Sequence, residues 1–349
     1  MKPDLFIQDD GFRLEFYAIK DPQKISSWRD RFLADDHAYV LQEMIIAPPG
    51  MIDEADKFSA STFTPDRCNK PFIFVGEPGS SFQYAATVAR IETEKVRIEK
   101  NNQAIKIFSG GVNLLYSAPI SSGSPHREQS FDGAFHRISE ISKGYQMEES
   151  AIVRTWLFLR DILGGYDELN SAREKFFNKW HSAKNKFLPA STGIQNRIIG
   201  NAMLAFGFCA FSGDGVKIRQ VSSPLQNEPT AYGKLFSRAV VVEFPRAKLL
   251  FISGTAAINR AGFSVHAEVF QNQLEFTLDV ISAILHQESG DFSNIAQAIV
   301  YLKRSEDMAS CLKILDKTGF PAERALFQAG VDICRDDLLC EIEAVAVIN

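Results

Sequence analysis

The sequence predicts an α+β fold of two tandem halves, each a mixed sheet with helices on one face, preceded by an N-terminal extension. Three observations predict it. Similar segments recur in the same order about 135 to 140 residues apart, these segments have the composition of strands, and amphipathic helical segments lie between them. Such a spacing is far longer than a solenoid repeat, so it indicates a duplicated domain. A length of 349 residues also favours more than one domain.

Four pairs of segments carry the duplication. The first half contains NLLYSAPI (113–120), AIVRTWLFLRD (151–161), LPASTGI (188–194) and AMLAFGFCAF (202–211). Their counterparts in the second half are KLLFISGTAAI (248–258), QAIVYLKRSED (297–307), FPAERAL (320–326) and DLLCEIEAVAV (337–347). Their content of apolar, β-branched and aromatic residues predicts strands.

Helical segments separate these strands. In VFQNQLEFTLDVISAILHQ (269–287), Leu274, Leu278 and Ile281 recur at helical spacing, and SFDGAFHRISEIS (130–142) occupies the same place in the first half. A second pair, LNSAREKFFNKWHSA (169–183) and MASCLKILDKTG (308–319), follows the next strand of each half. Each half therefore combines strands with two helices packed on one face of a mixed sheet.

The predicted domain boundaries follow from the repeat and from turn-forming residues. Residues 1–75 lie outside the duplication and are expected to form the N-terminal extension. The first half spans residues 76–221 and the second spans residues 222–349, with the join in SSPLQNEPTAYG (222–233), which is rich in turn formers.

Composition indicates a small-molecule ligand. A net charge of -5 argues against nucleic acid, which normally needs a clustered basic face. No apolar run reaches the roughly 18 residues of a membrane span and the N-terminus lacks a cationic leader, so we expect a cytoplasmic protein without a membrane partner. The five cysteines form no CxxC pair, the histidines form no HExxH motif, and GEPGS (76–80) lacks the lysine of a P-loop. We therefore expect neither a metal nor a cofactor.

The C-terminal segment CRDDLLCEIEAVAVIN (334–349) places charge within a strand. Its alternation puts Glu341 and Glu343 on one face with Leu339 and Val345. Charged residues are rarely fully buried unless paired. This pattern alone is compatible either with a solvated edge or with a carboxyl group that faces a pocket.

The second half resembles the reactive intermediate deaminase (RidA, or YjgF) family, which has a chorismate mutase-like fold. The resemblance rests on AYGKLFSRAV, LLFISGTAAI, FQNQLEFTLDVISAIL, IVYLKR, FPAERALF and LLCEIEAVAV, which follow the order of that family. The first half resembles a degenerate copy of the same unit. The resemblance therefore implies two tandem RidA-like halves.

Over most of residues 110–349 the chain is similar to the chorismatases, which hydrolyse chorismate and release pyruvate. Their pattern is matched by RTW (154–156), RQVS (219–222), FSRAV (236–240), FISGTA (251–256) and CRDDLLCEIE (334–343). The chain departs from the family between QVS and FSRA, where it has a shorter linker. The resemblance implies an enzyme that converts chorismate to pyruvate and a hydroxybenzoate.

Chorismate carries two carboxylates and an enolpyruvyl ether, so its site needs fixed cations and a proton donor. Arg154 and Arg238 are the predicted carboxylate anchors, because a guanidinium binds a carboxylate through two parallel hydrogen bonds. Glu341 matches the general acid of the family, and burial in an apolar strand raises a glutamate pKa toward that role. Tyr232 and Ser237 are predicted to donate hydrogen bonds to the substrate.

Cys334 is the predicted determinant of the product. We expect RDD (335–337) to form a hairpin turn, so that Cys334 and Glu341 lie on adjacent strands and face one substrate. A cysteine at this position resembles the branch of the family that makes 3-hydroxybenzoate, and Arg335 is expected to lower the pKa of its thiol. Glu343, two residues beyond Glu341, is expected to reach only the rim of the pocket.

Two other functions remain open on the sequence. One is a RidA-like deaminase of enamines or imines, in which Glu341 directs water and Arg324 holds the substrate. The other is a non-catalytic protein that binds an aromatic acid, if the short linker has removed essential contacts. The family resemblance is compatible with a monomer or a homotrimer.

Overall fold

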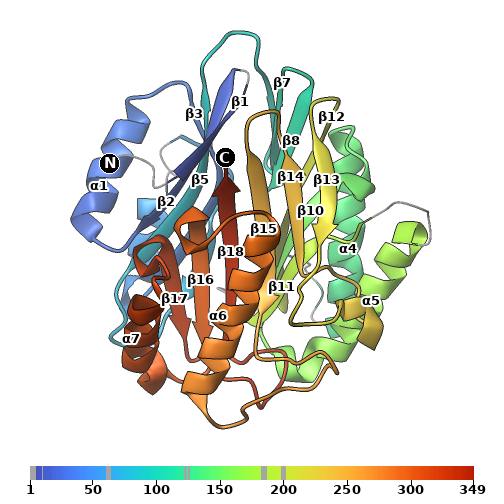
Figure 1. Ribbon diagram of the computed structural model, residues 1–349. Helices are drawn as coiled ribbons and strands as arrows, with labels where there is room; N and C mark the ends of the chain where they lie inside the picture. The colour runs from blue at the N-terminus through green and yellow to red at the C-terminus, as the bar shows by residue number, and fades with distance from the viewer. Residues whose placement is uncertain are drawn as a thin grey trace.

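The strands of the chain pair into three mixed sheets that follow one another along the sequence. The computed structural model describes residues 5–9, 11–59, 64–121, 124, 126–181, 187–197 and 202–349. Within these ranges the sheets contain five, seven and six strands (Figure 1). The predicted α+β fold is confirmed.

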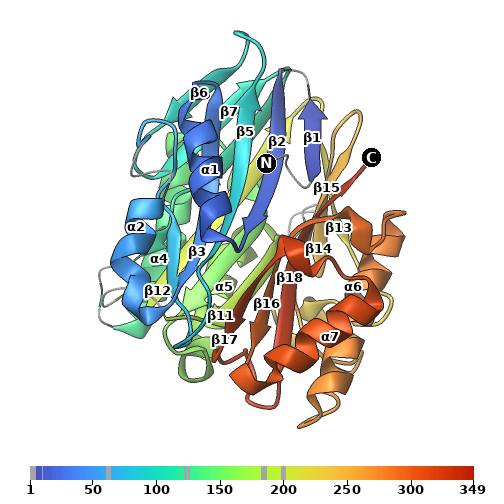
Figure 2. The same ribbon diagram turned by 90° about the vertical axis from the view of Figure 1, so that its left-hand side faces the viewer.

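The first sheet is built mainly from residues of the predicted N-terminal extension. Its strands are β1 (Leu5–Asp9), β2 (Phe12–Ile19), β3 (Ala38–Ala47), β4 (Phe72–Val75) and β5 (Gln83–Ile91), in the order β1-β2-β5-β3-β4. Helices α1 (Pro22–Leu33) and α2 (Ile52–Phe58) cover its outer face (Figure 2). We call these residues the first unit.

The second unit carries the seven-stranded sheet. Its strands are β6 (Arg97–Lys100), β7 (Ala104–Ser109), β8 (Val112–Ser117), β9 (Ile120–Ser121), β10 (Ile152–Leu159), β11 (Ala190–Gln195) and β12 (Leu204–Gly213). The order is β11-β10-β12-β8-β7-β6, with β9 paired to β12. Helices α4 (Arg127–Gly144) and α5 (Ile162–His181) pack on its outer face.

The third unit carries the six-stranded sheet. Its strands are β13 (Lys217–Val221), β14 (Ala239–Glu243), β15 (Lys248–Thr255), β16 (Ile295–Leu302), β17 (Ala325–Ala329) and β18 (Cys340–Ile348), in the order β13-β14-β15-β18-β16-β17. Helices α6 (Phe270–Gln287) and α7 (Met308–Thr318) cover its outer face. Leu274, Leu278 and Ile281 of α6 are buried as predicted, and Gly319, in the left-handed conformation with φ 72°, ends α7.

All three units share one topology. Along the chain, a hairpin is followed by a helix, a strand, a second helix, a strand parallel to the previous one, and a last strand. In the sheet, this last strand lies between the hairpin and the first strand of the parallel pair. The parallel pairs are β3 with β4, β10 with β11, and β16 with β17. The predicted N-terminal extension is therefore a third copy of the repeated unit, too divergent in sequence to be recognised beside the other two.

Strand pairing also sets the ends of the units. Strand β5 (Gln83–Ile91) belongs to the first sheet, so this sheet extends beyond the boundary that we expected at residue 75. Strand β13 (Lys217–Val221) pairs with β14 and opens the third sheet. The connection between the second and third units therefore lies before Lys217 rather than after residue 221.

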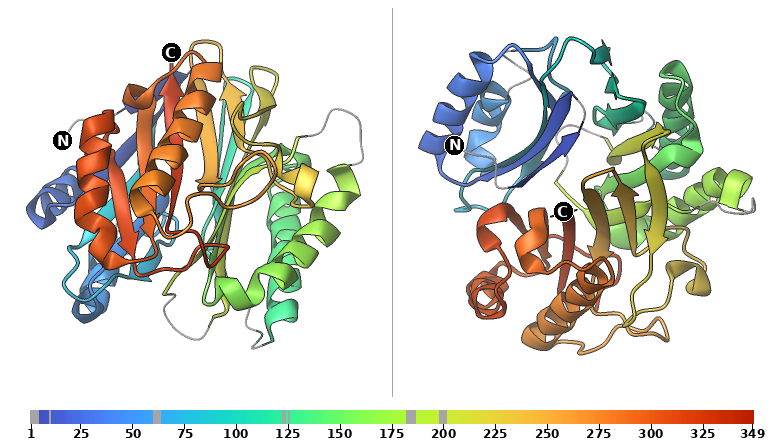
Figure 3. Two further views of the ribbon diagram at one scale, coloured as in Figure 1. Left: turned by 60° about the horizontal axis from the view of Figure 1, so that its bottom comes forward. Right: turned by 45° about the horizontal axis from the view of Figure 1, so that its top comes forward.

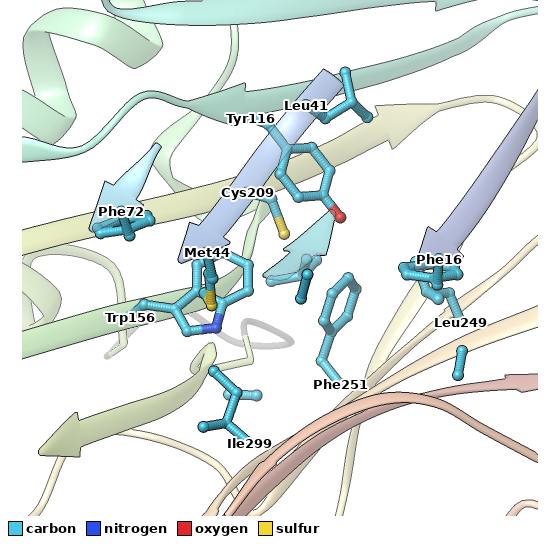
Figure 4. Packing of buried hydrophobic residues seen from close by; sticks show 14 of the residues in the cluster. Phe16, Leu41, Met44, Phe72, Tyr116, Trp156, Cys209, Leu249, Phe251 and Ile299 are labelled. Atoms are coloured by element: carbon cyan, nitrogen blue, oxygen red, sulfur yellow. The ribbon is translucent and has the colours of Figure 1, made fainter. Parts of the chain in front are cut away.

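The inner faces of the three sheets share one apolar core. Phe16 of the first unit, Trp156 of the second and Phe251 of the third belong to a single cluster of buried side chains (Figure 4). Successive residues of a strand point to opposite faces, so Tyr17 packs under the helices of its unit while Phe16 points inward. The three units surround the centre of the molecule, as the right-hand view of Figure 3 shows.

Among the described residues, no helix is long and apolar enough to cross a bilayer.

Candidate active site

A polar cavity lies where the second unit meets the third. Edge strand β11 of the second unit packs against β15 of the third, and the Ser191 amide donates a hydrogen bond to Ser253 Oγ (2.8 Å). The Gly254 amide donates to Thr192 Oγ1 (3.0 Å). The cavity measures about 240 Å³. Side chains of α5 and β11 form one wall, and Glu341 of β18 lies in the other, so we call it the Glu341 cavity.

The Glu341 carboxyl is almost completely withdrawn from solvent. Glu341 lies on the inner face of β18, is 4% exposed, and pairs with Tyr301 of the neighbouring strand β16. Burial raises its pKa to about 8, the nearby Glu343 adds to this rise, and Arg154 opposes it. A Cβ added at Gly254 would collide with Glu341 Oε1, so a glycine is needed where the carboxyl lies. The raised pKa therefore favours the protonated form of Glu341 at neutral pH.

Glu343 and Arg154 form a buried ion pair behind Glu341. Arg154 Nη2 lies 2.9 Å from Glu343 Oε2, and the indole of Trp156 donates to Glu343 Oε1 at 3.1 Å. Arg154 also donates to Thr192 Oγ1 at 2.5 Å and is 1% exposed. The expectation that Glu343 reaches only the pocket rim is therefore wrong, because the inner face of β18 here lies inside the protein. Arg154 is directed at Glu343 and is absent from the cavity wall, contrary to its predicted place beside the substrate.

Arg173 also lines the cavity, although it was not among the predicted site residues. It projects from α5, is 3% exposed, and donates to Ser191 Oγ at 3.3 Å. Its guanidinium lies 5.4 Å from the Phe236 ring, and burial lowers its pKa. The ion pairs among the described residues do not include Arg173. A buried guanidinium without a carboxylate partner is suited to an anionic ligand.

A sequence signal for Arg173 does exist. Leu169, Ala172 and Phe176 form the buried apolar stripe of α5, and Arg173 falls within that stripe. A charged residue on the core-facing side of a helix is unusual unless it is paired or binds a ligand.

Arg238 and Tyr232, two predicted substrate-binding residues, also line the Glu341 cavity. Arg238 is 3% exposed, donates to the Asn227 carbonyl from Nε (3.0 Å) and Nη2 (2.8 Å), and donates to the Tyr232 hydroxyl (2.9 Å). These contacts fix the guanidinium. The Ser237 hydroxyl instead donates to the Leu188 carbonyl at 2.8 Å and is absent from the cavity wall, so its predicted contact with the substrate is unsupported.

Cys334 lines the cavity, but its surroundings differ from the prediction. The chain turns after it, with the Leu338 amide bonded to the Arg335 carbonyl (3.2 Å), and strand β18 begins only at Cys340. Cys334 therefore lies in a loop rather than in an adjacent strand. Burial raises the pKa of its thiol to about 12, Glu341 adds to the rise, and Arg335 opposes it without reversing it. Arg335 thus has the expected lowering effect on the pKa of the thiol, but burial outweighs it.

Positive charge dominates the cavity wall. Among the described residues, four cationic side chains and one carboxyl group, that of Glu341, line it; the cations are Arg173, Arg238, Lys234 and Arg335. Because the raised pKa of Glu341 favours its neutral form, the described residues of this wall suit an anionic ligand with two carboxylates.

The structure also bears on the deaminase alternative and on metal binding. Arg324, the arginine of the deaminase alternative, donates to the carbonyls of Ser293 and Ile295 (both 2.9 Å) and is absent from the Glu341 cavity. Among the residues that the structure describes, no three His, Cys, Asp or Glu side chains are grouped so that they could hold a metal ion.

Comparison with known proteins agrees with this architecture. Residues 226–348 match the family model Endoribonuclease L-PSP. A 3-hydroxybenzoate synthase of Streptomyces hygroscopicus is 28% identical over 224 residues; the match spans 57% of this chain and 64% of that enzyme.

Solved structures were also compared with this chain, and one of them matches nearly its whole length. The crystal structure of a chorismatase aligns over 97% of this chain and 99% of its own, with a TM-score of 0.67 and 17% identity. A member of the YjgF protein family from Neisseria meningitidis aligns over 38% of this chain and 96% of its own, with 20% identity and a TM-score of 0.29. The chain therefore has the chorismatase fold, with residues 226–348 matching the Endoribonuclease L-PSP family, and the sequence resemblance to the chorismatases is confirmed.

Proposed function

We propose that this protein cleaves chorismate to pyruvate and a hydroxybenzoate, with 3-hydroxybenzoate as the favoured product. One observation carries the proposal: a protonated carboxylic acid, Glu341, lies in a cavity whose wall also holds the buried guanidiniums of Arg173 and Arg238. A dicarboxylate with an acid-labile enol ether needs this combination of cations and proton donor. The relative named a 3-hydroxybenzoate synthase supports the same product.

Glu341 acts as the general acid on the enolpyruvyl group. It transfers its proton to the methylene carbon, and the positive charge that develops at the ether carbon is relieved when water adds there. The resulting hemiketal breaks its bond to the ring oxygen and releases pyruvate. The ionised Glu341 is then stabilised by Arg154, which lies behind it and lowers its pKa.

Arg173 and Arg238 hold the two carboxylates of the substrate. Arg173 is the stronger candidate anchor, because the ion pairs of the described residues leave it without a carboxylate. Arg238 is fixed by Asn227 and Tyr232, which reduces the conformational entropy lost when a carboxylate binds. The predicted anchor Arg154 is reassigned to the support of Glu343.

Cys334 acts in the second step, in which the ring becomes aromatic. The ring must lose water, which balances the water consumed in the first step, so chorismate yields pyruvate and 3-hydroxybenzoate with no net water. After Glu341 has given up its proton it is a carboxylate that can accept the Cys334 proton. The thiolate formed can then attack the ring while one hydroxyl takes the proton back from Glu341 and leaves as water, which gives a thioether. Loss of a ring proton then breaks the carbon–sulfur bond, releases the thiolate and forms the aromatic product, so the carbon that is attacked decides which hydroxyl is lost.

The site is complete within one chain. The second unit supplies Arg173, and the third unit supplies Arg238, Cys334 and Glu341. A monomer therefore suffices for the proposed activity. The deaminase alternative receives no such support, because Arg324 lies outside this cavity.

The proton transfer gives the test. In D₂O the pyruvate released from chorismate should carry one deuterium in its methyl group, because the proton of Glu341 exchanges with solvent and is delivered to the methylene carbon. Mass spectrometry of the pyruvate measures this directly. Pyruvate without deuterium would contradict protonation by an exchangeable acid, and absence of pyruvate would contradict the proposed function itself.

A further inference from the structure

The position of Glu341 recurs in all three units. The last strand of each unit forms an equivalent pair with the end of the hairpin, and the pairs are Thr255 with Ile342, Ile120 with Phe206, and Ile19 with Tyr84. In the last strand, the residue just before each partner is Glu341 in the third unit, Ala205 in the second and Gln83 in the first. Strand pairing thus identifies two positions that correspond to the catalytic glutamate.

Each of these positions lies in the wall of a cavity between two units. Gln83 lies in a cavity of about 280 Å³ between the third unit and the first. Ala205 lies in a cavity of about 610 Å³ between the first unit and the second. In all three cases the cavity is also lined by the second helix and the parallel edge strand of the preceding unit. The molecule therefore contains three equivalent cavities, of which only one has the glutamate.

In the Gln83 cavity the amide of Gln83 is already hydrogen-bonded across the interface. The Gln83 amide donates to the Phe327 carbonyl (2.8 Å) and accepts from the Phe327 amide (2.8 Å). Both polar atoms of this side chain thus bind the backbone of edge strand β17. The amide group of Gln83 is therefore not free to bind a ligand in this cavity.

The Ala205 cavity is larger, and its wall is apolar. The parallel pairs Leu159 with Gln195 and Ala47 with Val75 align β11 with β4, so that Pro71 and Ile73 stand where Ser191 and Gly193 stand in the Glu341 cavity. Phe72, Phe74 and Ile120 complete the apolar wall.

The buried charges behind Glu341 are also missing from this interface. Gly207 occupies the position of Glu343, and the Phe72 ring packs against it, 2.8 Å from where a Cβ would lie. Neither the carboxylic acid nor its supporting ion pair has a counterpart here.

Charge decides which ligand the Ala205 cavity accepts. The charged residues at its edge are Asp53, Asp56 and Lys57, all on α2, with an excess of negative charge. An aromatic carboxylate such as the proposed substrate or product would be repelled there and would lose its hydration against apolar walls. An uncharged ring system gains from burial against Phe72 and Phe74.

We propose that the Ala205 cavity, between the first and second units, is a second small-molecule site that binds an uncharged aromatic ligand of two or more rings. A cavity of about 610 Å³ lies within the range that holds drug-sized molecules. The proposal rests on the geometry of this interface and is independent of the chemistry proposed for the Glu341 cavity.

A pair of matched fluorescent probes tests the charge selection. N-phenyl-1-naphthylamine is uncharged, and 8-anilinonaphthalene-1-sulfonate has the same ring system with a sulfonate. Titration of the full chain should show saturable binding of one uncharged probe, with the sulfonate at least tenfold weaker. Equal affinities, or no saturable binding of the uncharged probe, would overturn the proposal.

A filling substitution then locates the bound probe. Ala205→Phe places a ring in the cavity and should weaken binding of the uncharged probe at least tenfold, while Ala309→Phe, at an exposed position of α7, should leave it unchanged. If Ala205→Phe does not fold, Ile73→Trp fills the same cavity from β4. Unchanged binding in a folded filling variant, or displacement of the probe by 3-hydroxybenzoate, would place the probe elsewhere and refute the assignment.

Discussion

Replacing Glu341 by Gln should change how the stability of the protein depends on pH. In the folded chain burial raises the pKa of Glu341 to about 8, against an ordinary value of 4.5. Between these two values the folded state keeps the proton and the unfolded state releases it. The stabilisation that comes from this proton is complete below pH 4.5 and is lost as pH rises toward 8. Gln cannot ionise, so the unfolding free energy of the variant does not fall in this way as pH rises.

The size of the effect follows from the pKa difference. Each unit of pKa difference corresponds to about 1.36 kcal/mol. Between pH 5 and pH 8 the wild type should therefore lose on the order of 4 kcal/mol of unfolding free energy relative to Glu341→Gln. Glu343, Cys334 and Arg154 are present in both proteins, so the difference between the two free energies isolates the contribution of Glu341.

Urea unfolding at several pH values between 5 and 8 measures this difference. Glu275→Gln, an exposed change on α6, is the matched control and should follow the wild type at every pH. If the free energies of wild type and Glu341→Gln run parallel across this range, Glu341 is not a buried acid with a raised pKa, and its role as general acid loses its physical basis.

Three further substitutions test the remaining parts of the site. Arg173→Lys should raise KM for chorismate about tenfold or more with a smaller effect on kcat, since an ammonium does not replace a guanidinium that binds two oxygens; initial rates measure this, and an unchanged KM would remove Arg173 as an anchor. Cys334→Ala should keep pyruvate release and shift the aromatic product away from 3-hydroxybenzoate, and identical chromatograms for the two proteins would show that the thiol only packs. Glu343→Gln removes the negative neighbour of Glu341 and leaves Arg154 unpaired, so the loss of activity at high pH should begin at least one unit lower and stability should fall by about 3 kcal/mol. A pH profile of kcat that matches the wild type would contradict this support role.

The sequence predicted the parts of the fold that depend on periodicity. The strand alternation placed Glu341 and Glu343 on one face of β18 and Ile342 on the other, and the structure has this arrangement. The internal repeat predicted two units, because both copies keep their order of apolar segments. The third copy was missed because it differs at corresponding positions, with Pro71 and Ile73 where the second unit has Ser191 and Gly193.

The burial of Glu343 and its partners could not be predicted from the alternation of strand residues. Alternation assigns a face to Glu343 but does not show that Arg154 and Trp156, almost 190 residues earlier in the chain, close over it. For the same reason the sequence assigned to Arg154 the role for which Arg173 is better placed. Both are arginines at strand or helix positions, and only their contacts across the interface of two units distinguish a buried ion pair from an unpaired cation.

The most direct test of the proposed reaction is pyruvate release from chorismate, followed with lactate dehydrogenase, by the wild type and by Glu341→Gln. Far-ultraviolet circular dichroism should first show that both are folded. We expect the wild type to release one pyruvate per chorismate and the variant to be slower by about 10²-fold or more, since Gln keeps the shape of the side chain but cannot donate the proton. A folded wild type that releases no pyruvate, or a variant as fast as the wild type, would contradict the central claim that the buried acid of this cavity cleaves the enolpyruvyl ether.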